Sequence, residues 1–422
     1  MIDINNLDTR FESYFETLEN ENLFDKTLRL DKTLSGGILT GVEALGLTTE
    51  NKTSPISYLT DKNGEKRKVI MLGSNSYLNL SSNKKVIKSA KAALKKFGLA
   101  TGAVSNYAGI TQLHIELEHK IAKLYNTEDA IIYPSGYGAN MGIISALCSK
   151  NDVIICDSAN HASIMDGARL SGAEIKIYPH KNMKYLEKIL SEIPENKKGR
   201  LIITDGVFSM DGDMAPLDKI YELSKKYGCA IMTDDAHGIG ITGKTGKGTA
   251  EYFNLSGKID LNAGMLSKTP GGLGGYCAAK REIIQFLRLY SRTYFFSTSL
   301  PPAIVAGLNT SLELILKDEA GRSELMEKVS YFKDLLIASG FDIGNSQSAI
   351  IPLMVYDEEK LFKMHKFLLN SGIYTNIVTY PAVRRKECRL RLCVMKDLRY
   401  SDIEKAVKII TKAGIKFGLT DG

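Results

Sequence analysis

The chain has 422 residues, of which 44% are hydrophobic and 24% charged, and its net charge is +7. This length supports a large core and two domains, and this composition is typical of globular proteins rather than disordered or fibrous ones. The small basic excess indicates a mixed, solvated surface and no nucleic acid partner. No apolar run approaches the roughly 18 residues of a membrane span, and the first residues lack the apolar core of a signal peptide.

The six cysteines favour a reducing compartment. None belongs to a Cys-x-x-Cys pair, and most lie in apolar runs that resemble strands. Buried reduced thiols in a cytoplasmic protein without a metal site are therefore expected. The six are Cys148, Cys156, Cys229, Cys277, Cys388 and Cys393.

The N-terminal part, residues 1–55, is predicted to be a helical segment. It is polar and charged, and its aromatic side chains suit one or two helices that dock on another surface, such as a partner subunit. A hairpin follows over 56–72, because residues 61–64, which include Asn-Gly, separate two apolar runs. The aromatic residues are Phe11, Tyr14, Phe15 and Phe24.

An amphipathic helix is predicted over 84–97. Val86, Ile87, Ala90 and Leu94 recur at the spacing that places apolar side chains on one helical face. We therefore expect this face to be buried.

The middle of the chain alternates short apolar runs with stretches of helical length, which is typical of βαβ units. The fold class is thus predicted to be α/β, with a mostly parallel sheet of seven strands covered on both faces in a large domain over 56–300. The expected strands cover 130–133, 153–156, 174–178, 201–204, 230–233, 261–266 and 276–279.

Pro301-Pro302 marks a break after this domain. Residues 301–422 are predicted to form a linking helix over 303–316 and a smaller C-terminal α/β domain. The strands expected there cover 349–355 and 389–394, and the expected helices cover 358–370 and 401–413.

Polar side chains follow several of the predicted strands. Asp234 and His237 come after one strand, and Lys268 comes after the next, before a run rich in glycine. In parallel sheets, ligands bind outside the carboxyl ends of the strands. A lysine that forms a Schiff base and an acid that protonates the pyridine nitrogen are what a pyridoxal phosphate site needs. The lysine taken alone is better explained as a solvated surface residue, so the hypothesis depends on all of these residues together.

Residues 238–245 match the pattern G-x-x-x-x-G-K-[ST] of a nucleotide-binding loop. Such a loop needs a helix that begins at its lysine. Gly246 and Gly248 follow at once, so a helix is not expected and the match is rejected.

Other motifs each have two interpretations. His161 follows a strand and is either structural or stacked on a flat cofactor. Gly136 lies in either an ordinary turn or a helix N-terminus whose amides bind phosphate. Ser209 belongs to a strand-end turn or reaches a ring oxygen. Arg391 and Arg389 share one strand face, which is either a surface edge or a fork that binds a carboxylate.

In these motifs the sequence resembles the α-oxoamine synthase family of fold-type I pyridoxal phosphate enzymes. This family includes serine palmitoyltransferase, 8-amino-7-oxononanoate synthase, glycine C-acetyltransferase and 5-aminolevulinate synthase. The similarity covers about residues 55–415. The segments that carry it are 74–78, 113–118, 134–140, 160–167, 205–213, 234–238, 267–268 and 296–302.

The resemblance implies catalytic roles for four residues. Lys268 is the Schiff-base lysine and the proton-transfer base, Asp234 pairs with the pyridinium, and His161 stacks on the ring. His237 is expected to reach the phenolic oxygen together with Ser209.

The resemblance also implies a set of binding residues. Ser135, Gly136 and Tyr137 are expected at the phosphate, with Thr298 helping from the second subunit of a homodimer. The substrate carboxylate is expected to face Asn75 and Arg391.

Two positions depart from the family pattern. Many members have a threonine that contacts phosphate three residues before the lysine, where this chain has Met265. Ser267 is a possible substitute. Several branches have an arginine where this chain has Ser105, which points to an unusual acyl donor.

The function implied is condensation of an amino acid with an acyl thioester, on coenzyme A or an acyl carrier protein, with decarboxylation to an α-amino ketone. Two alternatives stay open at this point. One is another pyridoxal phosphate enzyme, such as an aminotransferase or aldolase, and the other is a non-catalytic subunit of a heterodimer.

Overall fold

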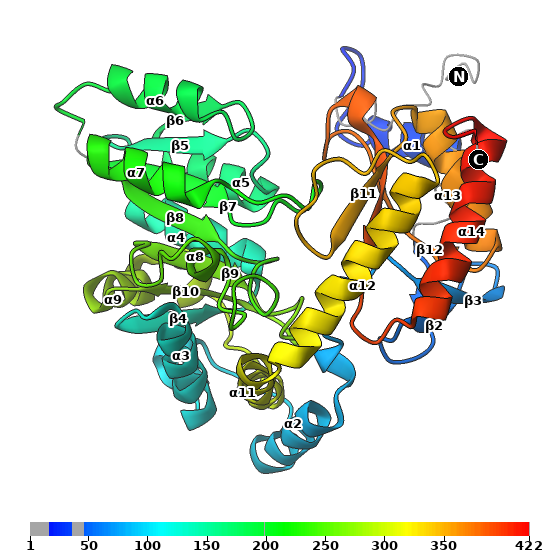
Figure 1. Cartoon of the computed structure of the whole chain (residues 1–422). Coiled ribbons are helices and arrows are strands. Elements are labelled where there is room, and N and C mark those ends of the chain that lie inside the picture. Colours follow the sequence, from blue (N-terminus) through cyan, green and yellow to red (C-terminus); the bar gives the residue numbers. More distant parts are fainter. Residues whose placement is uncertain (1–16, 36–45, 198, 422) are drawn as a thin grey trace. The chain divides into compact units, whose positions relative to one another are not determined.

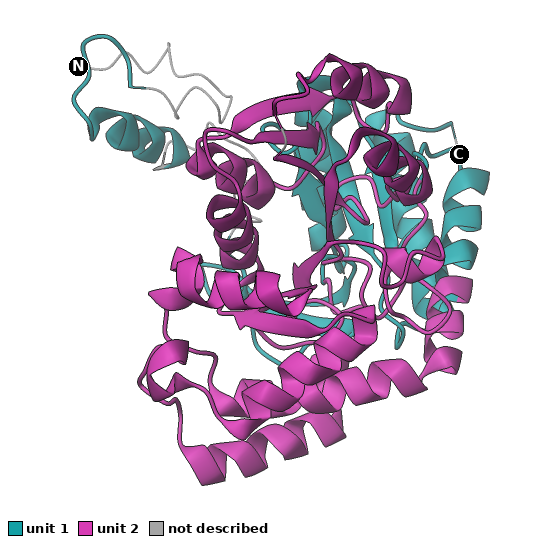
Figure 2. Ribbon diagram, turned by 90° about the vertical axis from the view of Figure 1, so that its left-hand side faces the viewer, with its two compact units in different colours: residues 1–74, 328–345, 350–422 teal, residues 75–327, 346–349 magenta. Residues whose placement is uncertain are grey.

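The computed structural model describes residues 17–35, 46–197 and 199–421. They divide into two compact units, shown in different colours in Figure 2. Unit 1 comprises residues 1–74, 328–345 and 350–422, and unit 2 comprises residues 75–327 and 346–349. None of the described helices combines the length and hydrophobicity that a membrane crossing requires.

Unit 2 is built on a sheet of seven strands in the order β4-β10-β9-β8-β7-β5-β6 (Figure 1). The pairs β9-β8, β8-β7, β7-β5 and β5-β6 are parallel, while β10 is antiparallel to both of its neighbours, β4 and β9. This confirms the predicted α/β class and the seven predicted strands. The strands are β4 (Asp129–Tyr133), β5 (Val153–Asp157), β6 (Glu174–Tyr178), β7 (Arg200–Asp205), β8 (Ala230–Asp234), β9 (Leu261–Met265) and β10 (Gly275–Ala279).

Both faces of this sheet are buried, which explains why its strands are continuous apolar runs rather than alternating ones. Ile154 and Cys156 of β5 belong to one core, and Val153 and Ile155 belong to the other. Helices on one face are α4 (Gly136–Leu147), α5 (Ala162–Ser171) and α9 (Arg281–Tyr290). Helices on the other face are α6 (Met183–Glu192), α7 (Leu217–Tyr227) and α8 (Thr249–Tyr252).

Further helices of unit 2 lie beside this core. Helix α2 packs on α11, and α11 also contacts α3. The predicted helix over 84–97 is confirmed, but only part of its expected face is buried, since Val86 is buried and Leu94 is 44% exposed. The bounds are α2 (Lys84–Phe97), α3 (Gln112–Tyr125), α10 (Arg292–Phe295) and α11 (Pro302–Lys317), with short helical turns η4 (Leu80–Ser82) and η5 (Ser105–Gly109).

Unit 1 contains two small sheets. One has the order β1-β2-β3-β12 and includes the predicted hairpin, and the other has the order β11-β14-β13. The strands are β1 (Thr48–Thr49), β2 (Ile56–Thr60), β3 (Lys66–Met71), β11 (Ile350–Met354), β12 (Ile373–Tyr374), β13 (Asn376–Val378) and β14 (Arg389–Cys393). The helical elements are α1 (Asp25–Ser35), α13 (Glu358–Asn370), α14 (Tyr400–Phe417) and the turn η6 (Arg385–Glu387), while α12 (Glu319–Ala338) begins in unit 2 and ends in unit 1.

The N-terminal segment is described in part. Helix α1 lies within the predicted helical segment, and Phe24, just before it, is 68% exposed. Phe11, Tyr14 and Phe15 lie outside the described residues. The sequence-based domain bounds at 56 and 300 remain a prediction. The two compact units are not continuous segments, since each is made of separate parts of the chain. All six cysteines are buried and free.

Candidate active site

The predicted polar residues of unit 2 meet at one edge of its large sheet. Asp205 ends β7 and lies opposite Asp234, which ends β8, and Asp234 lies opposite Ala263 of β9. Because parallel strands end at a common edge, their last residues line one pocket. It is lined by Gly136, Asn140, His161, Ser163, Asp205, Val207, Ser209, Asp234, Ala236, His237, Met265 and Lys268.

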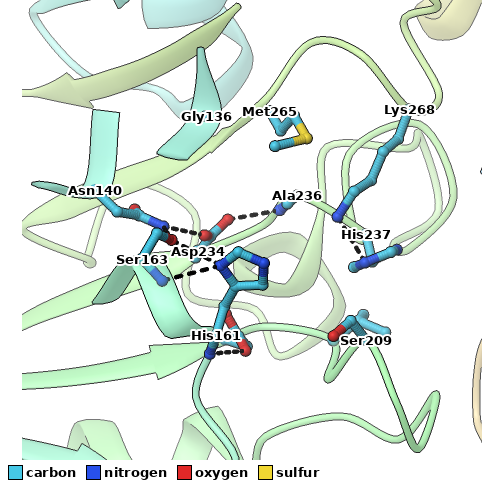
Figure 3. A pocket seen from close by; sticks show the side chains of 12 residues that line it. Gly136, Asn140, His161, Ser163, Ser209, Asp234, Ala236, His237, Met265 and Lys268 are labelled. Carbon is cyan, nitrogen blue, oxygen red and sulfur yellow. Dashed lines mark hydrogen bonds between the residues drawn. The ribbon is translucent and has the colours of Figure 1, made fainter. Parts of the chain in front are cut away.

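Lys268 extends its amine into this pocket (Figure 3). Its Nζ lies 2.6 Å from His237 Nε2, and His237 Nδ1 lies 2.8 Å from the hydroxyl of Tyr77. The same hydroxyl lies 3.4 Å from Asn75 Oδ1. A chain of hydrogen bonds therefore joins the lysine to Asn75, a predicted substrate-binding residue.

Asp234 points into the pocket from the side opposite Lys268 (Figure 3). It is only 6% exposed, and its two oxygens accept hydrogen bonds from Asn140 Nδ2 at 2.6 Å and from the amide of Ala236 at 2.9 Å. No cationic side chain of the described residues forms an ion pair with it. A buried carboxylate without a counter-charge is costly unless a ligand supplies one. Asp234 thus suits a cationic group such as a pyridinium.

His161 is held in place by a hydrogen-bond network that begins at Asp234. Asn140 donates to both Asp234 and Ser163, and the Ser163 hydroxyl lies 2.7 Å from His161 Nδ1. The Ser163 amide also donates to that nitrogen at 3.2 Å. Burial lowers the pKa of His161, so the ring is kept neutral. A neutral, fixed imidazole is suited to stacking on a flat ligand.

Asp205 orients the backbone of the same histidine. The amide of His161 donates to Asp205 Oδ2 at 3.0 Å, and the side chain of Asn160 accepts from the amide of Asp205 at 3.1 Å. Burial and the nearby carboxylate of Asp234 raise the pKa of Asp205 well above its ordinary value. The pocket therefore holds two carboxyl groups with different environments.

The N-terminus of α4 supplies backbone donors. Ser135 is the N-cap and accepts from the amide of Gly138 at 2.9 Å. The amides of Gly136 and Tyr137 have no hydrogen-bond partner among the described residues. Free amides at the positive end of a helix bind anions such as phosphate. The role of these residues at a phosphate stays a prediction.

Close packing surrounds Gly136. A Cβ placed on it would lie 2.5 Å from Met265 Cε, and a Cβ placed on Gly275 would lie 2.7 Å from Gly136 Cα. Only glycine allows β10 and Met265 to approach the start of α4 so closely. Met265 therefore covers one side of the predicted phosphate site.

The lysine-bearing loop is packed just as closely. Gly271 has a φ of +74°, and a Cβ there would lie 2.5 Å from the amide nitrogen of Ser81. This contact sets the loop that follows Lys268 against η4.

Some predicted site residues do not line the pocket. Ser267 and Thr298 are exposed, and Tyr137 contacts Asp166 through its hydroxyl. Arg391 belongs to β14 of unit 1, where it is 4% exposed and its Nη1 lies 3.0 Å from Cys393 Sγ. Their predicted roles stay predictions.

The sequence reasoning missed Asn140, Ser163 and Tyr77 as site residues. Each lies within a segment that carries the family resemblance, so that signal was present. The rejection of a nucleotide-binding loop over 238–245 is confirmed. No helix begins at Lys244, and α8 starts only at Thr249.

Comparison with known proteins identifies the family. Residues 67–410 match the profile of aminotransferase class I and II proteins. The chain belongs to this family. It is 39% identical over 353 residues to an 8-amino-7-oxononanoate synthase of Bacillus pumilus, with 84% of this chain and 90% of that protein covered. It is also 39% identical over 356 residues to 4-hydroxy-2,2'-bipyrrole-5-methanol synthase of a Serratia species, of which the chain spans only 54%.

Solved structures agree with this assignment. A serine palmitoyltransferase of Sphingomonas wittichii superposes with a TM-score of 0.89 at 32% identity, covering 94% of this chain and all of that one. An 8-amino-7-oxononanoate synthase of Francisella tularensis gives 0.73 at 27% identity, covering 83% and 98%. The resemblance to α-oxoamine synthases and the fold-type I architecture are thereby confirmed.

The cofactor of this aminotransferase class I and II protein is pyridoxal phosphate, which serine palmitoyltransferase structures with a TM-score of 0.88 contain. The residues fit it: Lys268 offers an amine, Asp234 an uncompensated buried carboxylate, and Gly136 a free amide at a helix N-terminus. The alternative of a non-catalytic subunit is not favoured, because the lysine is present and lies in the pocket.

Proposed function

We propose that this protein condenses an amino acid with an acyl thioester and releases CO2, so that an α-amino ketone is formed. The observation that carries the proposal is the placement of Lys268 and Asp234 on opposite sides of one pocket whose third side is the free N-terminus of α4. The α-oxoamine synthases among the relatives support this reaction over transamination or aldol chemistry.

When bound, pyridoxal phosphate supplies an electron sink that stabilises negative charge at the α-carbon of the amino acid. Lys268 would hold it covalently, and Asp234 would form an ion pair with its ring nitrogen. His161 would stack on one face. His237 and Ser209 would hydrogen-bond the phenolic oxygen.

The phosphate end would be held by backbone and hydroxyl donors. Ser135, Gly136 and Tyr137 supply them at the start of α4, and Ser267 adds an exposed hydroxyl near the lysine. Thr298 does not line the pocket of its own chain, and we propose that it acts on the pocket of a second subunit in a homodimer.

Proton transfer is assigned to Lys268. Its amine, once released by the incoming amino acid, would take the proton from the α-carbon. His237 lies 2.6 Å from this amine and is itself oriented by Tyr77, so the amine is held in one position. Asn75 and Arg391 would hold the substrate carboxylate, the arginine through two parallel hydrogen bonds. A cytoplasmic location agrees with the free thiols.

The test is to replace Lys268 with alanine and to assay two readouts. The wild type, reconstituted with pyridoxal phosphate, should absorb visible light and should release free thiol from octanoyl-coenzyme A with at least one amino acid of a panel. Lys268→Ala should lose both, while Lys280→Ala, an exposed lysine before α9, should keep both. A colourless wild type, or a keto acid in place of the thiol, would contradict the proposal.

A further inference from the structure

Helix α2 carries an unusual concentration of positive charge. Six of its 14 residues are exposed lysines, and residues 66–115 contain no aspartate or glutamate. None of these lysines forms an ion pair with the described residues. We call them the basic face; it comprises Lys84, Lys85, Lys88, Lys91, Lys95 and Lys96.

The basic face opposes the stability of its own helix. Lys84 and Lys85 occupy the first turn, where the helix dipole favours acidic residues, and none is present there. Lys84 and Lys88 are four residues apart, as are Lys91 and Lys95, and like charges at this spacing repel. Helices α13 and α14 instead mix acidic and basic side chains. The mixed surface expected from the low net charge is therefore wrong at α2.

The orientation of α2 leaves the lysines accessible within unit 2. Val86 and Ala93 are buried, and Val86 lies against Gly307 of α11. Figure 1 shows α2 beside α11 at the margin of the unit. Two apolar side chains lie near the far end of the basic face: Leu94 is 44% exposed and Leu99 is 81% exposed. These exposed apolar side chains give a partner that is attracted by the basic face some apolar surface to bury as well.

The start of α2 is tied to the pocket. Tyr77, seven residues before Lys84, contacts His237 through its hydroxyl at 2.8 Å. The turn η4, between Tyr77 and α2, contacts the loop that follows Lys268, because Gly271 approaches Ser81 closely. A partner bound at the start of α2 would thus stand beside the part of the chain that holds the lysine.

We propose that the basic face is the docking surface for an acidic acyl carrier domain, which delivers the acyl thioester to the pocket. This inference rests on the proposed function, whose donor it specifies. A helix of 14 residues is about 21 Å long. Charges spread over that length match the acidic face of a macromolecule better than the compact phosphates of coenzyme A.

The first test measures binding. Fluorescently labelled holo-acyl carrier protein is titrated with the enzyme loaded with cofactor, at 50 and 300 mM salt. Lys88→Glu/Lys91→Glu should raise Kd at least tenfold at the lower salt, and the higher salt should weaken wild-type binding. Lys219→Glu/Lys225→Glu on α7 makes the same change in net charge at exposed positions and should stay within twofold of the wild type.

The second test compares donors. The α2 variant should lose at least tenfold in kcat/KM with octanoyl-carrier protein and should match the wild type with octanoyl-coenzyme A. Equal losses with both donors, or no loss with either, would overturn the proposal. So would a variant that loses binding to a 20-base-pair DNA duplex while its carrier affinity is unchanged. If the wild type consumes neither donor, the proposed reaction fails, while the binding titration still decides the docking surface.

Discussion

Replacing His180 with glutamine tests an ionic contact beneath the pocket. His180 Nδ1 lies 2.9 Å from Asp157 Oδ1, and Nε2 lies 3.1 Å from Asp213 Oδ2. Asp157 ends β5, just before His161, and Asp213 follows Ser209 in the turn after β7. The imidazolium therefore joins the two loops that carry two pocket residues.

The stability that His180 contributes can be worked out from the pKa of its side chain. Burial opposes the charge on His180, but hydrogen bonds to Asp157 and Asp213 outweigh it and raise the pKa from 6.5 to about 9. This difference corresponds to about 3 kcal/mol of unfolding free energy, and screening of a side chain that is 30% exposed reduces it to about 2 kcal/mol. Because the folded-state pKa is raised, this stabilisation is fully present below pH 6.5 and is lost as the pH rises through 9.

The assay is urea unfolding of the wild type and the variant between pH 6 and 9.5. The two stability curves should differ by about 2 kcal/mol at pH 6 and should converge by pH 9.5. The carboxylates also face Lys181, whose Nζ lies 2.6 Å from Asp213 and keeps the cluster from becoming purely anionic. His119→Gln, at an exposed position of α3, is the control and should leave the pH dependence unchanged. A constant difference between wild type and His180→Gln across this range would refute the reasoning.

Three further predictions concern the ligand contacts. Asp234→Asn should raise the dissociation constant of pyridoxal phosphate ten- to hundredfold in an absorbance titration, since it removes about 1.5–3 kcal/mol of charged hydrogen bonding, and unchanged affinity would contradict the ring contact. Arg391→Ala should keep the cofactor colour but lose about 2–4 kcal/mol of amino acid affinity, and Arg391→Lys should lose much of this affinity too. If amino acids change the absorbance of the Arg391→Ala variant as they change that of the wild type, Arg389 is the carboxylate ligand instead. Met265→Thr should tighten cofactor binding severalfold, because a hydroxyl would replace the thioether beside the free amide of Gly136.

The sequence predicted the large sheet because its burial on both faces makes each strand a continuous apolar run. Helix α7 occupies one of the stretches of helical length that separate the predicted strands. The buried face of α2 was harder to predict: the apolar pattern included Leu94, which is exposed, whereas Ala93 is buried. The spacing of apolar residues predicts that a helix is present, while packing against other elements determines which of its side chains are buried.

The site was predictable where chemistry sits at strand ends, as for Asp234, His237 and Lys268. Asn140 was not, because its role depends on a helix placing an amide against a neighbouring strand, and an asparagine within a helix carries no local signal. Tyr77 likewise reaches His237 across 160 positions of sequence. The hydrogen bonds that orient catalytic groups are tertiary properties, and a pattern of residue types does not record them.

The contact between Gly136 and Gly275 has a consequence for engineering. Backbone contacts backbone there, so the start of α4 packs directly on the first residue of β10 with no side chain between them. Alanine at Gly275 would press on the backbone at the start of α4, while alanine at Gly136 would press on the side chain of Met265. Libraries aimed at new acyl donors should therefore leave this pair untouched and diversify α2, where most side chains point away from the core.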